Sequence, residues 1–180
     1  EYVQELSTES GTRVSVTDLI VSQVAQVLRK IPQLNVTCDG EKVTRIRNIN
    51  IGVAVAVPDG LLVPVVRNAD AKSEAEIAAE LRSLIDKARN GGLVPEDYSY
   101  GTFTVSNLGM LGVESFTSII NPPEVAILSV GAIVDRVRVI NGQAMIRPVF
   151  KATLNIDHRI ADGVIAGEFL NEFKRRCESL

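Results

Sequence analysis

The sequence has 180 residues, of which 46% are hydrophobic and 23% are charged. These proportions are typical of one folded domain with a substantial core, not of a disordered chain. The net charge is -3 and no run of Lys and Arg stands out, so we expect no nucleic-acid partner. Aromatic residues make up only 4%, which argues against stacking surfaces for single strands or sugars. The longest apolar stretches have about the length of a strand, so we expect no membrane partner.

The two cysteines, Cys38 and Cys177, show neither paired nor metal-type spacing. Two free thiols in a reducing compartment are the simplest interpretation, and we expect no metal site. The chain opens with Glu1-Tyr2-Val3-Gln4-Glu5, which lacks the basic segment of a secretory signal. These features together favour a soluble, intracellular protein.

The first half of the chain predicts one helix followed by a hairpin. Ser15-Val16-Thr17-Asp18 has capping-box spacing and opens a helical apolar pattern that Pro32 ends. Ile49 to Val57 and Leu61 to Val66 are rich in β-branched residues. Pro58-Asp59-Gly60 between them is a good turn, so the two runs predict a hairpin.

The next segment predicts a second helix, from Ser73 to Asn90, because Ser73-Glu74-Ala75-Glu76 is another capping box and Gly91-Gly92 closes the pattern. Strand-like runs and a last helix follow: Gly101 to Val105, Val125 to Val130, Val134 to Ile140, Ala144 to Ile156, and helix Val164 to Cys177. Asn141-Gly142 is a type I′ hairpin signal. Helices and strands mix without strict alternation, which predicts an α+β fold with a mixed, largely antiparallel sheet.

His158 is the single histidine and lies in Asp157-His158-Arg159-Ile160-Ala161-Asp162-Gly163, between a strand-like and a helical run. A lone histidine is often an ordinary surface or hydrogen-bonded residue. Histidine as a residue type nevertheless suits general acid-base chemistry near neutrality, because an unperturbed imidazole titrates at about pH 6.5. Asp162 has two compatible interpretations: the N-cap of the last helix, or a carboxylate that supports a site around the histidine.

Ser106 lies where a strand-like run passes into turns marked by Gly109 and Gly112. The segment Ser106-Asn107 is compatible with an ordinary turn that leaves a strand. The functional alternative is a hydroxyl that donates a hydrogen bond to a developing oxyanion. The sequence pattern alone leaves both open.

Several segments resemble the dihydrolipoamide acyltransferases, and they occur in that family's order. Asp157-His158-Arg159, two residues, then Asp162-Gly163 is similar to the active-site signature of the family. The chloramphenicol acetyltransferases resemble the signature more loosely. The other similar segments are Ser15–Ile20, Asn50–Ala56, Gly60–Val65, Gly101–Gly109 and Ile119–Glu124. The resemblance covers roughly Val14 to the C-terminus.

The resemblance implies a chloramphenicol acetyltransferase-like fold and transfer of an acyl group between a dihydrolipoyl thioester and coenzyme A. It implies that His158 is the base that takes the proton of the attacking thiol, and that Ser106 stabilises the tetrahedral oxyanion. Asp162 completes the expected catalytic set. Asn107 and Asn121 match positions where we expect contacts with coenzyme A. The lipoate is expected on a separate domain.

The resemblance also implies partners. We expect a homotrimer that assembles into a larger core, with His158 of one subunit facing Ser106 of the next. The core would work with a lipoyl domain and with the E1 and E3 components of a 2-oxo acid dehydrogenase complex. The compartment would be the bacterial cytoplasm or, in a eukaryote, the mitochondrial matrix.

The expected domain organisation is a catalytic domain over residues 1–180 that is incomplete at its N-terminus. The family's catalytic domains begin before the segment that matches Val14, with an opening helix and strand that we expect to be missing. Asp86-Lys87-Ala88 matches the tripeptide that carries lipoate, but Lys87 falls inside a predicted helix, whereas a lipoyl lysine needs an exposed β-turn. We therefore expect neither a lipoyl nor a subunit-binding domain here.

Two alternatives remain open at the level of function. One is a non-catalytic structural core subunit, against which the presence of His158 argues. The other is a stand-alone O-acetyltransferase of the chloramphenicol acetyltransferase type. Among acyl groups, Ser106–Met110 and Ile119–Pro123 look more like acetyl-transferring members than succinyl- or branched-chain-transferring ones.

Overall fold

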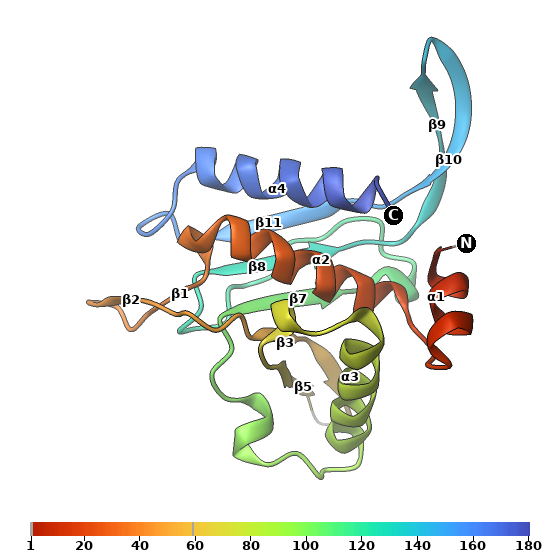
Figure 1. The fold of residues 1–180 in the computed structure, drawn as a ribbon. Coiled ribbons are helices and arrows are strands. Elements are labelled where there is room, and N and C mark those ends of the chain that lie inside the picture. The colour runs from red at the N-terminus through yellow and green to blue at the C-terminus, as the bar shows by residue number, and fades with distance from the viewer. Residues whose placement is uncertain (1, 59) are drawn as a thin grey trace.

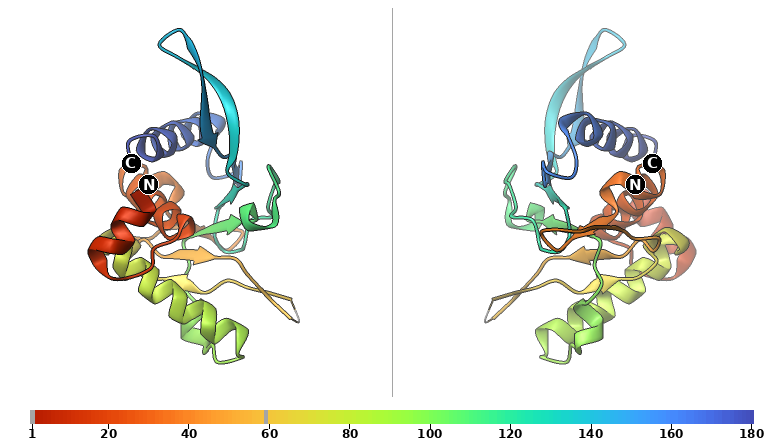
Figure 2. Two further views of the ribbon diagram at one scale, coloured as in Figure 1. Left: turned by 90° about the vertical axis from the view of Figure 1, so that its right-hand side faces the viewer. Right: turned by 90° about the vertical axis from the view of Figure 1, so that its left-hand side faces the viewer.

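The computed structural model describes residues 2–58 and 60–180. A central sheet carries helices α2 and α4 on one of its faces, and a long hairpin projects from the body (Figure 1). Figure 2 shows the helices on one side of the sheet, with the chain between β7 and β8 extending on the other side. This one-sided arrangement leaves the second face of the sheet to loops and polar side chains.

The helices are α1 (Tyr2–Ser10), α2 (Val16–Lys30), α3 (Glu74–Arg89) and α4 (Gly163–Cys177), with short 3-10 turns at Pro32–Leu34, Ala69–Ala71, Pro95–Tyr98 and Gly109–Leu111. The capping boxes predicted at the starts of α2 and α3 are both present, with Ser15 and Ser73 as N-caps. Each N-cap hydroxyl accepts a hydrogen bond from the backbone N–H three residues on, which satisfies a donor that the helix itself leaves free.

Helix α1 is not predicted by the sequence pattern. It precedes Val14, where the resemblance to the family begins. It buries none of its residues completely. Tyr2, Val3 and Leu6 pack against a small cluster formed by Val14, Leu19 and Ala78. Its helical state therefore depends on this contact with α2 and α3 more than on its own weakly amphipathic sequence.

The strands are β1 (Val36–Cys38), β2 (Val43–Arg45), β3 (Ile51–Val53), β4 (Val55–Val57), β5 (Gly60–Leu62), β6 (Val65–Val66), β7 (Phe103–Asn107), β8 (Ala126–Val130), β9 (Val134–Ile140), β10 (Gln143–Val149) and β11 (Ala152–Ile156). The central sheet has the order β11-β8-β7-β3-β6. Its outer pairs, β11–β8 and β3–β6, are antiparallel, whereas β7 runs parallel to both β3 and β8. The remaining pairs β1–β2, β4–β5 and β9–β10 are antiparallel. The predicted mixed α+β class is confirmed.

Both predicted hairpins form, but three of their four predicted strands each divide into two. Asn141 and Gly142 have φ of 51° and 78°, the left-handed conformation that a type I′ turn requires. Ala144 to Ile156 is not one strand, since β10 belongs to the projecting hairpin and β11 to the central sheet. The run Ile49 to Val57 likewise divides into β3 and β4, and the run Leu61 to Val66 into β5 and β6. Of these, β4 pairs with β5 and β3 pairs with β6. In the turn predicted between β4 and β5, Asp59 lies outside the described residues.

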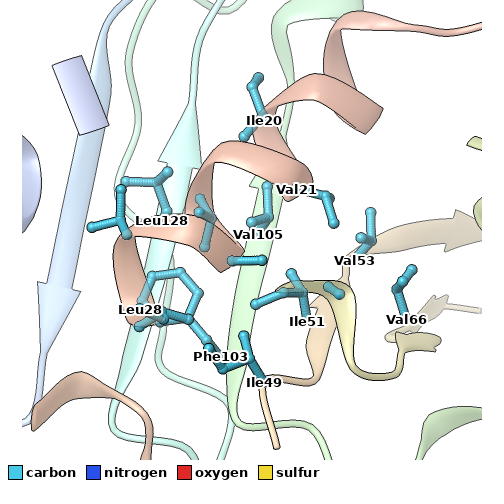
Figure 3. Close-up of a cluster of buried hydrophobic side chains, with 14 of the residues drawn as sticks. Ile20, Val21, Leu28, Ile49, Ile51, Val53, Val66, Phe103, Val105 and Leu128 are labelled. Carbon is cyan, nitrogen blue, oxygen red and sulfur yellow. The ribbon is translucent and has the colours of Figure 1, made fainter. Parts of the chain in front are cut away.

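The main core fills the space between the sheet and its helices (Figure 3). Ile20, Val21 and Leu28 of α2 meet Ile51, Val53, Phe103, Val105 and Leu128 of the sheet. Phe169 of α4 stacks on Phe103 with 5.3 Å between ring centroids. Complete burial of one such aliphatic or aromatic side chain stabilises a fold by roughly 1.5–3 kcal/mol. This packing fixes the sheet and so fixes the polar face behind it.

Candidate active site

The face of the sheet away from the helices carries several small and polar side chains. On β7, Phe103 and Val105 belong to the core, so by strand alternation Thr104 and Ser106 point to the other face. Ser129 of β8 is the register partner of Ser106 and shares this face. Thr104 and Ser129 are each only 1% exposed, while Ser106 is half-buried. The predicted oxyanion donor thus lies on a buried polar surface, not in a loose turn.

Asn107 ends β7 and is held at both ends of its amide. Its Nδ2 donates to Thr17 Oγ1 at 3.0 Å, and its Oδ1 accepts from the backbone N–H of Gly109 at 2.8 Å. A Cβ on Gly109 would come within 2.8 Å of the Gly131 carbonyl oxygen, so the chain can turn this closely only with glycine there. Asn107 therefore ties the end of β7 to the start of α2. A contact with coenzyme A remains a prediction.

His158 lies at the junction predicted for it, between the end of β11 and the start of α4, and its side chain is exposed. The backbone N–H of Asp157 donates to the Val125 carbonyl at 2.8 Å, which continues the ladder of the sheet up to the turn. Arg159 donates to both carboxylate oxygens of Asp157, at 3.0 Å from Nε and 2.6 Å from Nη2. These bonds lower the pKa of Asp157 to about 2. The neighbours of His158 thus fix the turn that presents it.

Asp162 is the N-cap of α4. Its Oδ1 accepts from the backbone N–H groups of Val164 and Ile165, at 2.9 and 3.0 Å. The cap interpretation of Asp162 is confirmed by these bonds. They hold the beginning of the helix that follows the histidine turn, which is compatible with a supporting role in the site.

Ser106 and His158 do not meet within one chain. Ser106 is level with Ser129, and Ser129 is level with Thr153 of β11. From Thr153 the chain stays extended to Asp157, which at about 3.3 Å per residue carries His158 on the order of 13 Å beyond the level of Ser106. Two strand spacings of about 4.8 Å separate β11 from β7 as well. The two proposed catalytic side chains are therefore too far apart to act on the same atom in one copy.

Glu124 is the residue of this region that the sequence pattern does not single out. Its side chain is buried, and its Oε2 accepts from Thr104 Oγ1 at 2.5 Å. Burial raises the pKa of the Glu124 carboxyl to about 7, against hydrogen bonds from Thr104 and Asn121 that lower it. A side chain at Gly101 would collide with this carboxyl group. The sequence offers one signal for Glu124: it is a charged residue directly before the apolar run that forms β8.

Asn121 lies close to Glu124 at the edge of a cleft of about 840 Å³. The cleft is lined mainly by amide, hydroxyl and aromatic side chains, including Asn50, Thr102 and Tyr100. Arg67 lies over the ring of Tyr100, with its Cζ 5.3 Å from the ring centroid. The structure therefore places Asn121 beside Glu124 in an open polar cleft, and Asn107 at the end of β7.

Several other expectations can be compared with the described part of the chain. Lys87 lies within α3 and pairs with Asp97 at 3.2 Å, as expected for a helix-surface lysine and not for a lipoyl turn.

Cys38 and Cys177 are free thiols. Among residues 2–58 and 60–180, no helix is long and apolar enough to cross a membrane. The same residues contain no group of three or more His, Cys, Asp or Glu side chains that could hold a metal ion.

Solved structures with this architecture define the fold class. A chloramphenicol acetyltransferase aligns over 96% of this chain and 81% of its own, with a TM-score of 0.60 and 17% identity, which shows a common fold alone. A probable dihydrolipoamide acetyltransferase from Listeria monocytogenes aligns over 97% of this chain and 75% of its own, with a TM-score of 0.91 and 42% identity. The chain thus has the chloramphenicol acetyltransferase-like acyltransferase fold.

Residues 1–180 match the model of the 2-oxoacid dehydrogenases acyltransferase family (catalytic domain), and the chain belongs to this family. The acetyltransferase component of the pyruvate dehydrogenase complex of Rickettsia conorii is 42% identical over 96% of this chain and 42% of its own length. An Arabidopsis thaliana mitochondrial component of the same type is 45% identical over 94% of this chain and 32% of its own. The chain therefore spans less than half the length of these relatives.

Two further structures bear on assembly and mechanism in the family. The cubic core of a pyruvate dehydrogenase multienzyme complex has a TM-score of 0.86 and 36% identity, covering 94% of this chain and 71% of that one. The dihydrolipoamide acetyltransferase of Azotobacter vinelandii has a TM-score of 0.86 and 35% identity with the same coverage of both chains. The latter work concerns the role of one serine, one histidine and one asparagine in the catalytic mechanism of that enzyme.

Proposed function

We propose that this chain transfers an acetyl group between a dihydrolipoyl thioester and coenzyme A, as the catalytic domain of a pyruvate dehydrogenase-type complex. The observation that carries the proposal is a match of intervals. The intervals from serine to histidine and from histidine to asparagine in the Azotobacter enzyme equal those from Ser106 to His158 and from His158 to Asp162. An N-capping carboxylate, Asp162, stands in place of the asparagine, and both residue types cap helices well.

In the proposed mechanism His158 accepts the proton of the coenzyme A thiol. An ordinary thiol has a pKa near 8.5, so little thiolate exists at pH 7 and a positioned base increases the reactive fraction. The sulfur attacks the thioester carbonyl carbon, and the resulting oxyanion accepts a hydrogen bond from the Ser106 hydroxyl. Collapse expels the dihydrolipoyl sulfur, which takes the proton back from His158. The reverse transfer uses the same steps in the opposite order.

The separation of Ser106 from His158 supports a site formed by two copies of the chain. Because one copy cannot bring both side chains to one thioester, His158 must act on a substrate held by Ser106 of a neighbour. A closed ring of copies gives every interface the same pair of residues. We therefore propose the homotrimer and a larger core built from trimers. The lipoyl domain and the E1 and E3 components would be the partners of that core, in the bacterial cytoplasm or the mitochondrial matrix.

Asn107 and Asn121 are proposed to contact coenzyme A near the same site. Asn121 borders the polar cleft described above, and a cleft of that size can hold a ligand of drug-like dimensions. Asn107 is the weaker candidate, because Thr17 and Gly109 already engage its amide.

The direct test is acetyl transfer from S-acetyldihydrolipoamide to coenzyme A by the purified, assembled protein, beside its His158→Ala variant. A normal rate in His158→Ala would overturn the mechanism, and an inactive parent protein would favour a structural core subunit. Small alcohols as acceptors provide the comparison for a stand-alone O-acetyltransferase. Transfer to alcohols in preference to the thiol would favour that alternative.

A further inference from the structure

The chain from Ser118 to Glu124 crosses the polar face of the sheet beside Ser106, and one hydrogen bond holds each of its ends. At one end, Thr104 donates to the Glu124 carboxyl group at 2.5 Å. At the other end, the hydroxyl oxygens of Ser118 and Ser129 lie 2.7 Å apart. We call Ser118–Glu124 the wall segment.

The two attachment points on the sheet, Thr104 and Ser129, are neighbours of Ser106 on its face. Thr104 lies two residues before Ser106 on β7, and Ser129 is the register partner of Ser106 on β8. Along a strand, same-face neighbours are about 7 Å apart, and across strands about 5 Å. The wall segment is thus attached to the sheet next to Ser106 both on its own strand and on the neighbouring strand.

Glu124 is built tightly into this arrangement. Thr104 and Glu124 are 1% and 5% exposed, so their bond is screened from water, whereas the bond between Ser118 and Ser129 is part-buried. A Cβ on Gly52 would lie 3.0 Å from Thr104 Oγ1, and one on Gly101 would collide with the Glu124 carboxyl. Glycine at position 101, just before β7, therefore leaves the room that this carboxyl occupies, and glycine at position 52 of β3 leaves room for the Thr104 hydroxyl. A buried carboxyl is costly unless hydrogen-bonded, so the segment has few alternative positions.

We propose that Glu124 is a positioning residue for acetyl transfer: its bond to Thr104 holds the wall segment against the sheet and so fixes the space beside Ser106. This inference rests on the proposed function for its kinetic consequence. Its structural part, the clamping of residues 118–124 by Glu124 and Thr104, can be measured independently of activity. Asn121 lies within the same segment, so a loosened wall would also move that side chain.

The experiment compares Thr104→Val, Glu124→Ala, the double variant and Glu124→Gln in the assembled protein. Thr104→Val is nearly isosteric and removes the donor, whereas Glu124→Gln keeps an acceptor for Thr104. Glu114→Gln is the matched control, because Glu114 lies in the same loop but pairs with Arg136 in an exposed position. We expect each of the first two variants to lower kcat about tenfold with less than about a threefold change in KM for coenzyme A. The double variant should lose no more than either alone, since both remove one bond.

Glu124→Gln and Glu114→Gln should keep kcat within about twofold of the parent. Unchanged kcat in Thr104→Val, or losses that multiply in the double variant, would overturn the proposal. Hydrogen exchange supplies the second measurement: peptides covering 113–125 should exchange faster in Thr104→Val and Glu124→Ala, and not in Glu114→Gln. Unchanged exchange in Thr104→Val would refute the clamp, whether or not the parent protein transfers acetyl groups. A parent protein without transfer activity would refute the proposed function alone, and the exchange measurement would still test the clamp.

Discussion

Ser106 of β7 is level with Thr153 of β11 across the intervening strand, and His158 follows Thr153 by a stretch of extended chain that leads away from Ser106. The serine and histidine expected to act together are thus at different levels of the same sheet. This relationship decides how activity should depend on assembly.

Mixed assemblies of two inactive variants should regain activity. When His158→Ala and Ser106→Ala subunits are unfolded together and reassembled in equal amounts, some interfaces join an intact Ser106 to an intact His158. Random mixing gives about a quarter of all interfaces this pairing, so we expect about a quarter of the parent rate. The measurement is acetyl transfer after co-assembly, with each variant reassembled alone as control. Recovery no greater than the sum of these controls would place both residues in the same copy.

Ser106→Ala should lower kcat by about 10²-fold, because a donor to a developing oxyanion contributes mainly in the transition state. The affinity for coenzyme A, measured by calorimetry, should change little. Equal losses in kcat and affinity would indicate that Ser106 acts in binding or folding. Glu114→Gln, which removes only an exposed ion pair with Arg136, is the control variant and should keep the parent kcat.

Asp162→Ala should destabilise the start of α4 by about 1 kcal/mol, since it removes the acceptor for two backbone N–H groups. Asp162→Asn should keep most of that stability, because asparagine is an equally good N-cap. Denaturant unfolding of the two variants provides the measurement. If Asp162 supports the site only through this cap, the asparagine variant should also keep acetyl transfer close to the parent. A large loss of activity with unchanged stability would instead assign a direct role to the carboxylate.

Local signals in the sequence predict most elements correctly because the deciding interactions are local. The capping boxes of Ser15 and Ser73 and the turn at Asn141-Gly142 involve residues a few positions apart, and all three form as predicted. The division of Ala144 to Ile156 into two strands depends on which partner each half finds, β9 or β8. No pattern within the run contains that information.

The residues of the candidate site also differ in whether local sequence signals predict them. His158 and Asp162 stand out because their junction and cap are local features, and Ser106 because a strand meets glycine-marked turns. Glu124 does not stand out, because its hydrogen bond to Thr104 and the room left for its carboxyl by Gly101 involve residues that are distant in the sequence. Likewise, the separation of Ser106 from His158 follows from the register of three strands. Only the assembled sheet fixes such distances.

Glu124 should make stability depend on pH in a direction opposite to that of an ordinary ion-paired carboxylate. Its pKa in the folded protein is raised from 4.5 to about 7. Between these values the folded chain retains a proton that the unfolded chain releases, so stability falls as pH rises through this window and is level above it. Each pKa unit corresponds to about 1.4 kcal/mol, so the full cost of ionising Glu124 is on the order of 3 kcal/mol.

Glutamine at this position carries no charge at any pH. The free energy of unfolding of Glu124→Gln, measured against the parent at a fixed protein concentration, should therefore rise relative to the parent between pH 5 and pH 8. Glu114→Gln should show no such trend, and a constant difference between Glu124→Gln and the parent would mean that Glu124 ionises at its ordinary pKa.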